Sequence, residues 1–264
     1  MGDKDGVMKL LTVVCGLLIS SVVACGANVG IGVFPQVVTG NGWTTTFIFS
    51  NTSPSTSSVI TMDFFDMAGH PMPVSFRDPL NSLPTLQQPQ ITIRVGAKQT
   101  YTFDTISYLA GIQQGYALVT TPTGPIVVNA KCVVAYRSGA SISESVTSAL
   151  PFTMNNYGIA LNNTNGFSTG VAWVNFDTQK PLVMRIVARD EYGTLIVDEI
   201  ATLCEGCQVS FSTPTRFPQT AGKRGILECF LLTSLASSNS HAAVAFRFNP
   251  AGSFTTMDTF PVTE

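Results

Sequence analysis

Trp43-Thr-Thr-Thr-Phe-Ile-Phe-Ser-Asn51 and Phe167-Ser-Thr-Gly-Val-Ala-Trp-Val-Asn175 are two versions of one nine-residue stretch, 124 positions apart. Both stretches are rich in β-branched and aromatic residues, and both end in Asn. Such runs are typical of β-strands, because branched and aromatic side chains pack well on a pleated surface. The chain therefore contains the same predicted strand twice.

The repetition extends well beyond these two stretches. The matching pairs are Asp66 with Asp190, Gly69 with Gly193, Gly115 with Gly225, and Arg137 with Arg247. The first two pairs keep the spacing of 124, and the last two have a spacing of 110. The difference of 14 predicts an insertion in the first copy, near Arg77 to Gln90. A repeat of this kind describes scaffold, since it preserves strand and turn positions and not a reactive centre.

Each copy predicts about seven short strands, the pattern of a β-sandwich. In each copy the second strand ends in Asp, followed three residues later by Gly, as in Asp66-Met-Ala-Gly69 and Asp190-Glu-Tyr-Gly193. Asp accepts backbone hydrogen bonds at the start of a turn, and Gly tolerates positive φ at its end. The predicted strands are 44–49, 59–65, 73–76, 100–104, 116–120 and 126–137 in the first copy, and 168–174, 182–188, 194–201, 209–212, 226–231 and 242–248 in the second.

Segments between these strands have their own predictions. The insertion contains Pro79, Pro84 and Pro89, and since Pro cannot donate to a ladder we expect an extended surface loop. Residues 105–112 and 214–221 occupy equivalent places and predict a short helical turn. The link between the copies lies near 146–151. We therefore predict two domains, 33–148 and 149–264, each large enough to bury its own core.

Composition excludes some classes of function. Charged residues make up only 11% of the chain and the net charge is −2, with polarity supplied mainly by Ser, Thr, Asn and Gln. Lys and Arg form no run or stripe, so the sequence indicates no nucleic-acid partner. The low content of Lys and Glu also argues against exposed helices.

The N-terminus predicts export. Lys9 precedes an apolar stretch from Leu10 to Ala24, which is too short for a comfortable membrane span and suits a signal peptide over residues 1–27. Translation start sites at Met1 and at Met8 both remain open. Val22-Val23-Ala24-Cys25-Gly26 resembles a bacterial lipobox, which predicts a lipid attached to Cys25. The alternative is an ordinary cleavage site with Cys25 incidental. If Cys25 carries the lipid, we expect the protein to contact the membrane only through that anchor.

The chain resembles a family of uncharacterised exported bacterial proteins with tandem immunoglobulin-like modules. The motifs that carry the resemblance are Gly-Asn-Gly-Trp-Thr-Thr-Thr at 40–46, Asn51, Asp66-x-x-Gly69, Arg216-Phe-Pro-Gln-Thr-Ala-Gly-Lys-Arg-Gly225 and Phe246-Arg-Phe-Asn-Pro250. The resemblance implies an all-β fold of two immunoglobulin-like sandwiches after the signal segment, with a periplasmic, outer-membrane or extracellular location. It implies no activity. The Pro-rich insertion and the Cys204/Cys207 pair depart from the family's pattern.

Four cysteines lie beyond the N-terminal segment. Cys204-Glu-Gly-Cys207 is half of a zinc motif, but no second pair of ligands accompanies it, so we expect a hairpin turn whose thiols stay free or close a small disulfide. Cys132 and Cys229 leave two alternatives, a bridge between the copies and, as we prefer, two buried free thiols.

The remaining candidates favour structure over chemistry. His70 and His241 lack the Gly-x-Ser-x-Gly context of a nucleophile. Trp43 and Trp173 match Phe167 and Phe49, so both positions stay aromatic and favour core packing over a sugar platform. Turn aspartates such as Asp66 lack the spacing of an EF-hand. The repeated Arg137 and Arg247 indicate pairing with carboxylates or carbonyl oxygens.

The sequence therefore predicts an exported protein that is not an enzyme and has no cofactor or metal. We expect a structural, adhesive or partner-binding module whose partner is an unknown protein or glycan. A glycan-binding protein is the alternative, and exposed aromatic side chains aligned on one sheet face would favour it. A hydrolase or metal protein is the remote alternative. It would need His70 or His241 beside a Ser or a carboxylate, or two further ligands near Cys204 and Cys207.

Overall fold

A computed structural model describes residues 29–78, 81–106, 111–122, 127–150, 156–232 and 240–263. The fold is all-β with several antiparallel sheets, which confirms the predicted fold class at this level. The described helical elements are α1 (Thr213–Arg216) and the 3-10 turn η1 (Pro218–Thr220), both inside the predicted range 214–221 or one residue from it. Among the described residues, no helix has the length and apolar character needed to cross a membrane. The predicted signal segment and Cys25 lie outside the described residues.

Nineteen strands make up the described structure, and each predicted strand is present. They are β1 (Val29–Thr39), β2 (Trp43–Asn51), β3 (Ser58–Asp66), β4 (Val74–Asp78), β5 (Asn81–Gln88), β6 (Gln90–Val95), β7 (Thr100–Ile106), β8 (Gln113–Thr121), β9 (Val128–Ser138), β10 (Ser141–Ser148), β11 (Tyr157–Asn162), β12 (Ser168–Asn175), β13 (Leu182–Asp190), β14 (Leu195–Leu203), β15 (Gln208–Ser212), β16 (Arg224–Leu231), β17 (His241–Phe248), β18 (Phe254–Met257) and β19 (Thr259–Pro261).

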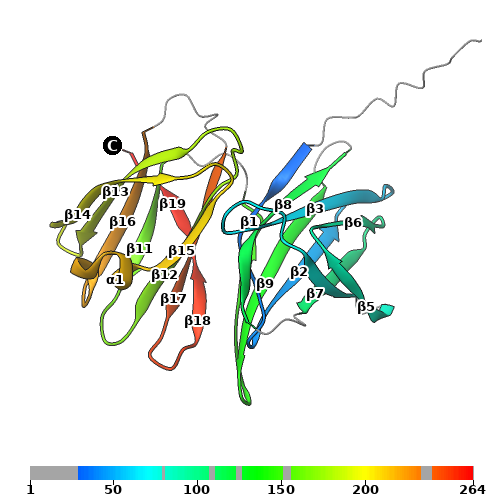
Figure 1. Ribbon diagram of the computed structural model, residues 1–264, viewed down its shortest axis with the longest axis horizontal. Coiled ribbons are helices and arrows are strands. Elements are labelled where there is room, and N and C mark those ends of the chain that lie inside the picture. The colour runs from blue at the N-terminus through cyan, green and yellow to red at the C-terminus, as the bar shows by residue number, and fades with distance from the viewer. Residues whose placement is uncertain are drawn as a thin grey trace, which may run out of the picture.

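The strands form two pairs of sheets, here called the first half (β1–β10) and the second half (β11–β19). In the first half the orders are β1-β8-β3-β6 and β10-β9-β2-β7-β4-β5. In the second half they are β14-β13-β16-β11-β19 and β15-β12-β17-β18. When strands are matched by their place in the repeat, the two halves share most strand neighbours, but the return strand β4 pairs with β7 whereas its counterpart β14 pairs with β13. Figure 1 shows the halves side by side, with the first in blue to green and the second in yellow-green to red.

The pairing of the first and last strands of each repeat differs from the pairing in an immunoglobulin constant domain. In that domain the first strand shares a sheet with the second, and the last strand shares a sheet with the sixth. Here β1 pairs with β8 and β9 pairs with β2, so the first and last strands have exchanged sheets. The same exchange occurs in the second half, where β11 pairs with β16 and β17 with β12.

Each half has its own core between its two sheets. Along β2 every second residue is buried, and Phe47 contacts Phe34 and Phe64 of the opposite sheet with ring centroids 5.4 and 5.8 Å apart. In the second half Trp173 of β12 is fully buried with Ile186 and Leu227. Burying such side chains contributes roughly 1.5–3 kcal/mol each, and truncating Phe47 to Ala would cost about 3–5 kcal/mol.

The predicted turns are present in both halves with the same hydrogen bonds. The Asp66 side chain accepts from the backbone N–H groups of Ala68 and His70 at 2.8 and 2.9 Å. The Asp190 side chain accepts from those of Tyr192 and Thr194 at 3.0 and 2.9 Å. Gly69 and Gly193 close the two turns with φ of 82° and 81°, a conformation that side chains with a Cβ disfavour.

The two strand-ending asparagines also make equivalent bonds. The Asn51 amide donates to the carbonyls of Thr56 and Val95, and the Asn175 amide donates to those of Lys180 and Cys204, all at 2.8 to 3.0 Å. Each Asn side chain joins the loop that follows its own strand to the chain segment shortly before the neighbouring strand of the same sheet. This explains why both strands end in the same residue type.

The sheet that contains β12 and β17 is buried on both faces. Seven of the eight β12 residues and six of the eight β17 residues are buried, without alternation. One face belongs to the second core, whereas Ala172, Val244 and Phe246 on the other face join the core of the first half. The continuous apolar run in β12 is the pattern of a strand covered on both sides.

Two sequence predictions are wrong. The insertion is not an extended surface loop, because residues 81–88 form β5 and pair with β4 in an irregular register. Prolines are tolerated there since β5 lies at the edge of its sheet. Arg137 and Arg247 are also not equivalent. Thr46 of the first half pairs with Val133, and its counterpart Gly170 pairs with Phe246. Val133 and Phe246 are 113 positions apart, so the last strands correspond at a spacing of 113 and not 110.

The structure places two other segments differently from the sequence prediction. Residues 146–148 of the expected link belong to β10, and Val146 pairs with Val133. Residues 105–106 end β7, and residues 107–110 of the expected helical turn lie outside the described part of the chain. Strand β1 was not predicted, because its glycines and Pro35 interrupt the alternation, and register shifts occur near Gly30 and Pro35.

Candidate binding cleft between the two halves

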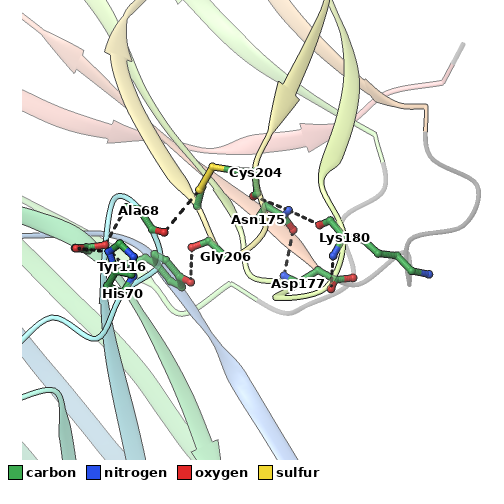
Figure 2. The surroundings of a disulfide bond; sticks show 10 residues. Ala68, His70, Tyr116, Asn175, Asp177, Lys180, Cys204 and Gly206 are labelled. Carbon is green, nitrogen blue, oxygen red and sulfur yellow. Dashed lines mark hydrogen bonds and ion pairs between the residues drawn. A yellow bond between two sulfur atoms is a disulfide. The ribbon is translucent and has the colours of Figure 1, made fainter.

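The Cys204–Cys207 loop of the second half touches the Asp66–Gly69 turn of the first half. Cys204 and Cys207 form a disulfide, so the small-disulfide alternative is the one found here. Figure 2 shows the Ala68 carbonyl oxygen facing this disulfide, with the Cys207 sulfur 3.9 Å away. The backbone N–H of Gln208 donates to the carbonyl of Met67 at 3.0 Å. Two hairpins from opposite halves are thus held together.

Tyr116 strengthens this contact from the first half. Its hydroxyl donates to the carbonyl of Gly206 at 2.8 Å, and Figure 2 shows the two groups pointing toward one another. Burial, followed by the nearby Asp66 carboxylate, raises the pKa of Tyr116 well above its ordinary value. The phenol is therefore protonated at neutral pH and can act as a donor.

Gln208 forms a second link beside the disulfide loop. Its buried side-chain amide donates to the carbonyl of Pro35 at 2.9 Å and to the side-chain oxygen of Gln36 at 3.0 Å. The Ser210 hydroxyl donates to the same Gln36 oxygen at 2.9 Å. Because these bonds are buried, breaking any one leaves a polar group without water, which costs about 1–3 kcal/mol.

A third contact joins the edge strands β10 and β18. The backbone N–H of Phe254 donates to the Ser143 hydroxyl at 2.8 Å, and the Thr256 hydroxyl donates to the Val146 carbonyl at 3.0 Å. The Trp43 ring lies over this contact, 5.4 Å from the ring centroid of Phe254. The two halves are therefore joined at two separated places, and a cleft lies between those places.

The cleft has a volume of about 380 Å³. Its second-half wall is the outer face of the β12 sheet, where the small residues Gly170 and Ala172 lie among phenylalanines. Among the described residues that line it, none is charged. The residues that line the cleft include Trp43, Met67, Ile112, Ala172, Ser210 and Phe246. An apolar cavity of this size is suited to an uncharged apolar ligand.

The rim of the cleft exposes apolar side chains to solvent. Met67 is 40% exposed and Ile112 is 53% exposed, and both line the cleft. Single exposed apolar residues are ordinary on protein surfaces, but a cluster that continues into an apolar cleft is typical of a binding site.

A second, more polar groove lies on the outer face of the β2 sheet. Trp43, Thr44, Arg77, Arg137 and Glu144 line it, and its volume is about 530 Å³. Among the described residues, no carboxylate forms an ion pair with Arg77 or Arg137. This groove therefore offers two guanidinium groups and one carboxylate.

The structure places the candidate histidines apart from one another. His70 lies on the Asp66 turn, with its Nδ1 3.5 Å from the Asp66 carboxylate and both side chains in solvent. His241 is buried in β17 and stacks on Tyr157 at a centroid distance of 6.0 Å. In the described part of the chain, no three His, Cys, Asp or Glu side chains converge as metal ligands.

The remaining candidate residues are distributed as follows. Trp173 is buried in the second core, and Trp43 is half-buried over the contact between the halves. Cys132 and Cys229 are free and buried in different cores. The Arg247 guanidinium stacks on the Phe167 ring, 3.9 Å from its centroid, and among the described residues it forms no ion pair with a carboxylate, one of the two kinds of partner that the sequence predicted.

Sequence reasoning missed the residues that join the halves, namely Gln36, Met67, Tyr116 and Gln208. Gln208 directly precedes the predicted strand 209–212, where a polar residue is ordinary, so its position carried no signal. Nothing in the sequence paired it with Gln36. Comparison of the chain with protein-family models, with curated proteins and with solved structures found no match.

Proposed function

We propose that this protein is a non-catalytic binding module, exported from the cell, that holds an uncharged apolar ligand in the cleft between two tandem immunoglobulin-like sandwiches. In this proposal residues 1–27 direct export and Cys25 carries the lipid that anchors the protein. The observation that supports binding most directly is the uncharged cleft with its exposed apolar rim of Met67 and Ile112.

Rigidity of the junction supports the same function. The disulfide loop, Tyr116 and Gln208 hold one end of the cleft, and the β10–β18 contact holds the other. A cleft whose walls are fixed before the ligand arrives loses little conformational entropy on binding. The tandem arrangement therefore provides the site, because the cleft lies between the two halves.

A neutral fluorescent probe, N-phenyl-1-naphthylamine, tests the proposal. The test variant is Ile112→Lys, and Leu195→Lys is its control, because Leu195 is exposed to nearly the same degree, 52%, and does not line the cleft. We expect the wild type and the control to bind the probe alike. The test variant should bind at least tenfold more weakly, since a charge at the rim must lose water when the probe binds. Equal binding by the two variants, or none by the wild type, would contradict the proposal.

Glycan binding is the second candidate function, and the groove with Trp43, Arg77 and Arg137 favours it. Two guanidinium groups suit a sugar that carries a carboxylate, because Arg binds carboxylates through two parallel hydrogen bonds. Isothermal titration with glucuronic-acid oligosaccharides would reveal it. Binding that is lost in Arg137→Gln and kept in Ile112→Lys would assign the ligand to this groove and not to the cleft.

A further inference from the structure

Strand β15 has an unpaired edge beside the cleft. It is the terminal strand of its sheet, and among the described residues only β12 pairs with it. In an antiparallel ladder the backbone groups of alternate residues point toward the partner strand and away from it. The N–H of Gln208 points away from β12, since it donates to Met67 of the first half. By alternation the backbone groups of Ser210 and Ser212 point to the same open side.

The cleft reaches around this open edge. Ser210 and Ser212 lie on one face of β15 and Phe211 on the other, because successive side chains of a strand alternate. All three residues nevertheless line the cleft. Ser210 and Ser212, whose backbone groups point to the open side, both line the cleft, and among the described residues no second strand pairs with β15, so this side of the strand borders the cleft.

The first half shows what occupies the corresponding edge there. Its strand β7 corresponds to β15, and β4 pairs with it in the register Arg77↔Asp104, Phe76↔Thr105 and Ser75↔Ile106. The insertion adds β5 beyond β4. The second half has no such insertion, and its return strand β14 stays in the other sheet.

Nothing in the β15 sequence protects the edge from another strand. Natural edge strands are usually guarded by charges, Pro or bulges. The sequence Gln208-Val-Ser-Phe-Ser212 has no charged residue and no Pro. Its pairing with β12 shows no register shift. The hydrogen bond from Gln208 to Met67 already forms the first contact of an added strand, so the open edge continues an existing interface.

We propose that the cleft receives an extended, uncharged segment of a partner polypeptide, which pairs with the open edge of β15 and places alternate apolar side chains in the cleft. This inference rests on the proposed function and names the class of its ligand. Main-chain hydrogen bonds to an edge supply affinity in this mode of recognition, and the apolar cavity supplies specificity. A lipid chain could fill the cavity but could not use the backbone groups of Ser210 and Ser212.

The first test uses a hexapeptide of alternating Val and Thr with blocked ends. N-methylation of the Val residues and N-methylation of the Thr residues give two further peptides. One of these loses the N–H groups that face β15, and the other loses only those that face away. We expect the peptide to pair antiparallel to β15, as β4 does with β7. In that direction, turning the strand over would move the Val side chains out of the cleft, so the two forms are not equivalent. We expect one N-methylated peptide to bind at least tenfold more weakly than the other, measured by fluorescence anisotropy with a dye-labelled peptide.

The second test changes the protein. Ser210→Pro removes the outward N–H without touching the bonds to β12, and Pro is tolerated at such edge positions. Ser210→Ala loses the hydroxyl bond to Gln36 but keeps the N–H. We expect the Pro variant to bind the peptide at least tenfold more weakly than the Ala variant, with circular dichroism used to check that both fold. Should the Pro variant not fold, the two N-methylated peptides still decide the question with the wild-type protein.

The outcomes separate this inference from the proposed function. Equal binding of the two N-methylated peptides, or no peptide binding at all while N-phenyl-1-naphthylamine still binds in the cleft, overturns strand pairing and leaves an apolar cleft. Loss of both probe and peptide binding in the wild type overturns the proposed function itself. A tenfold difference between the N-methylated peptides, abolished in Ile112→Lys, supports both.

Discussion

The Tyr116 hydroxyl and the Gly206 carbonyl, separated by 90 residues in sequence, lie 2.8 Å apart and join the two halves of the molecule. Gly206 belongs to the disulfide loop, and the same loop meets the Asp66–Gly69 turn. The repeat supplies the same hairpin turn at Asp66–Gly69 and at Asp190–Gly193. In the described structure the first of these turns contacts the other half, and a Cβ at Gly193 would meet no atom within 4 Å. The predictions below test this contact and the two cores on either side of it.

Replacing Tyr116 with Phe should lower the free energy of unfolding by about 1–3 kcal/mol, because the Gly206 carbonyl would lose its buried donor. Tyr192→Phe serves as the control, since Tyr192 is 86% exposed. Urea unfolding followed by tryptophan fluorescence measures both. If the two variants are equally stable, the hydrogen bond contributes nothing to joining the halves.

Gly69→Ala and Gly193→Ala form a matched pair. Both glycines have φ near 80°, so an added Cβ costs about 1–2 kcal/mol of backbone strain at either position. At Gly69 the Cβ would also lie 2.6 Å from the Gly206 carbonyl oxygen, whereas at Gly193 it would meet no atom within 4 Å of the described structure. Gly69→Ala should therefore be the less stable variant by chemical denaturation. If Gly69→Ala is as stable as Gly193→Ala, or more stable, the close approach of Gly206 does not constrain the turn at Gly69.

Reduction of the Cys204–Cys207 disulfide should loosen the junction more than it destabilises the fold. A closed loop of four residues is worth about 2 kcal/mol by chain entropy. Cys204 is exposed, so a small reductant can reach it. We expect faster amide hydrogen exchange at Ala68 and Gln208 after reduction, with little change in β3 or β16. Unchanged exchange at both positions would show that the loop keeps its place without the disulfide.

Cys132 and Cys229 can report on the two cores separately. Both thiols are buried, and burial raises the pKa of Cys229 to about 12 and that of Cys132 further still. Neither should react with iodoacetamide at pH 8 in the native protein, because the reactive thiolate is scarce and shielded. In increasing urea, mass spectrometry should show the two cysteines labelled at different midpoints if each half unfolds by itself. A shared midpoint would indicate one cooperative unit.

The Arg185–Asp198 pair predicts a small pH dependence of stability. Hydrogen bonding to Arg185, at 2.7 and 2.8 Å, holds the pKa of Asp198 below its ordinary value. The ionised carboxylate therefore stabilises the folded state at neutral pH, and this contribution is lost as the pH falls through the lowered pKa. Arg185→Gln should raise that pKa toward the ordinary value, as an NMR titration of Asp198 would show. The effect on stability should be small, since both side chains are exposed.

Local signals predicted the parts of the fold that local physics controls. The turns at Asp66 and Asp190 were predictable, since side-chain capping and positive φ act within four residues. The strands around Phe47 and Trp173 were predictable from their β-branched and aromatic residues. The strand β5 in the insertion was not predictable, because a Pro-rich edge strand and a Pro-rich loop have the same composition. The mismatch of Arg137 with Arg247 arose because the connection between β16 and β17 is three residues longer than the connection between β8 and β9, which changes the spacing.

By itself the sequence determined an all-β chain with a repeated set of strands and turns, since repetition, alternation and turn residues are properties of short segments. Only the tertiary structure decided that the outer face of β12 and β17 would pack against the first half, leaving a cleft and an open edge at β15. That outcome depends on Tyr116 meeting Gly206 and on Gln208 meeting Gln36. Contacts between residues so distant in the chain leave no periodic pattern, because which surfaces meet depends on the shape of two finished sheets and not on any one stretch of sequence.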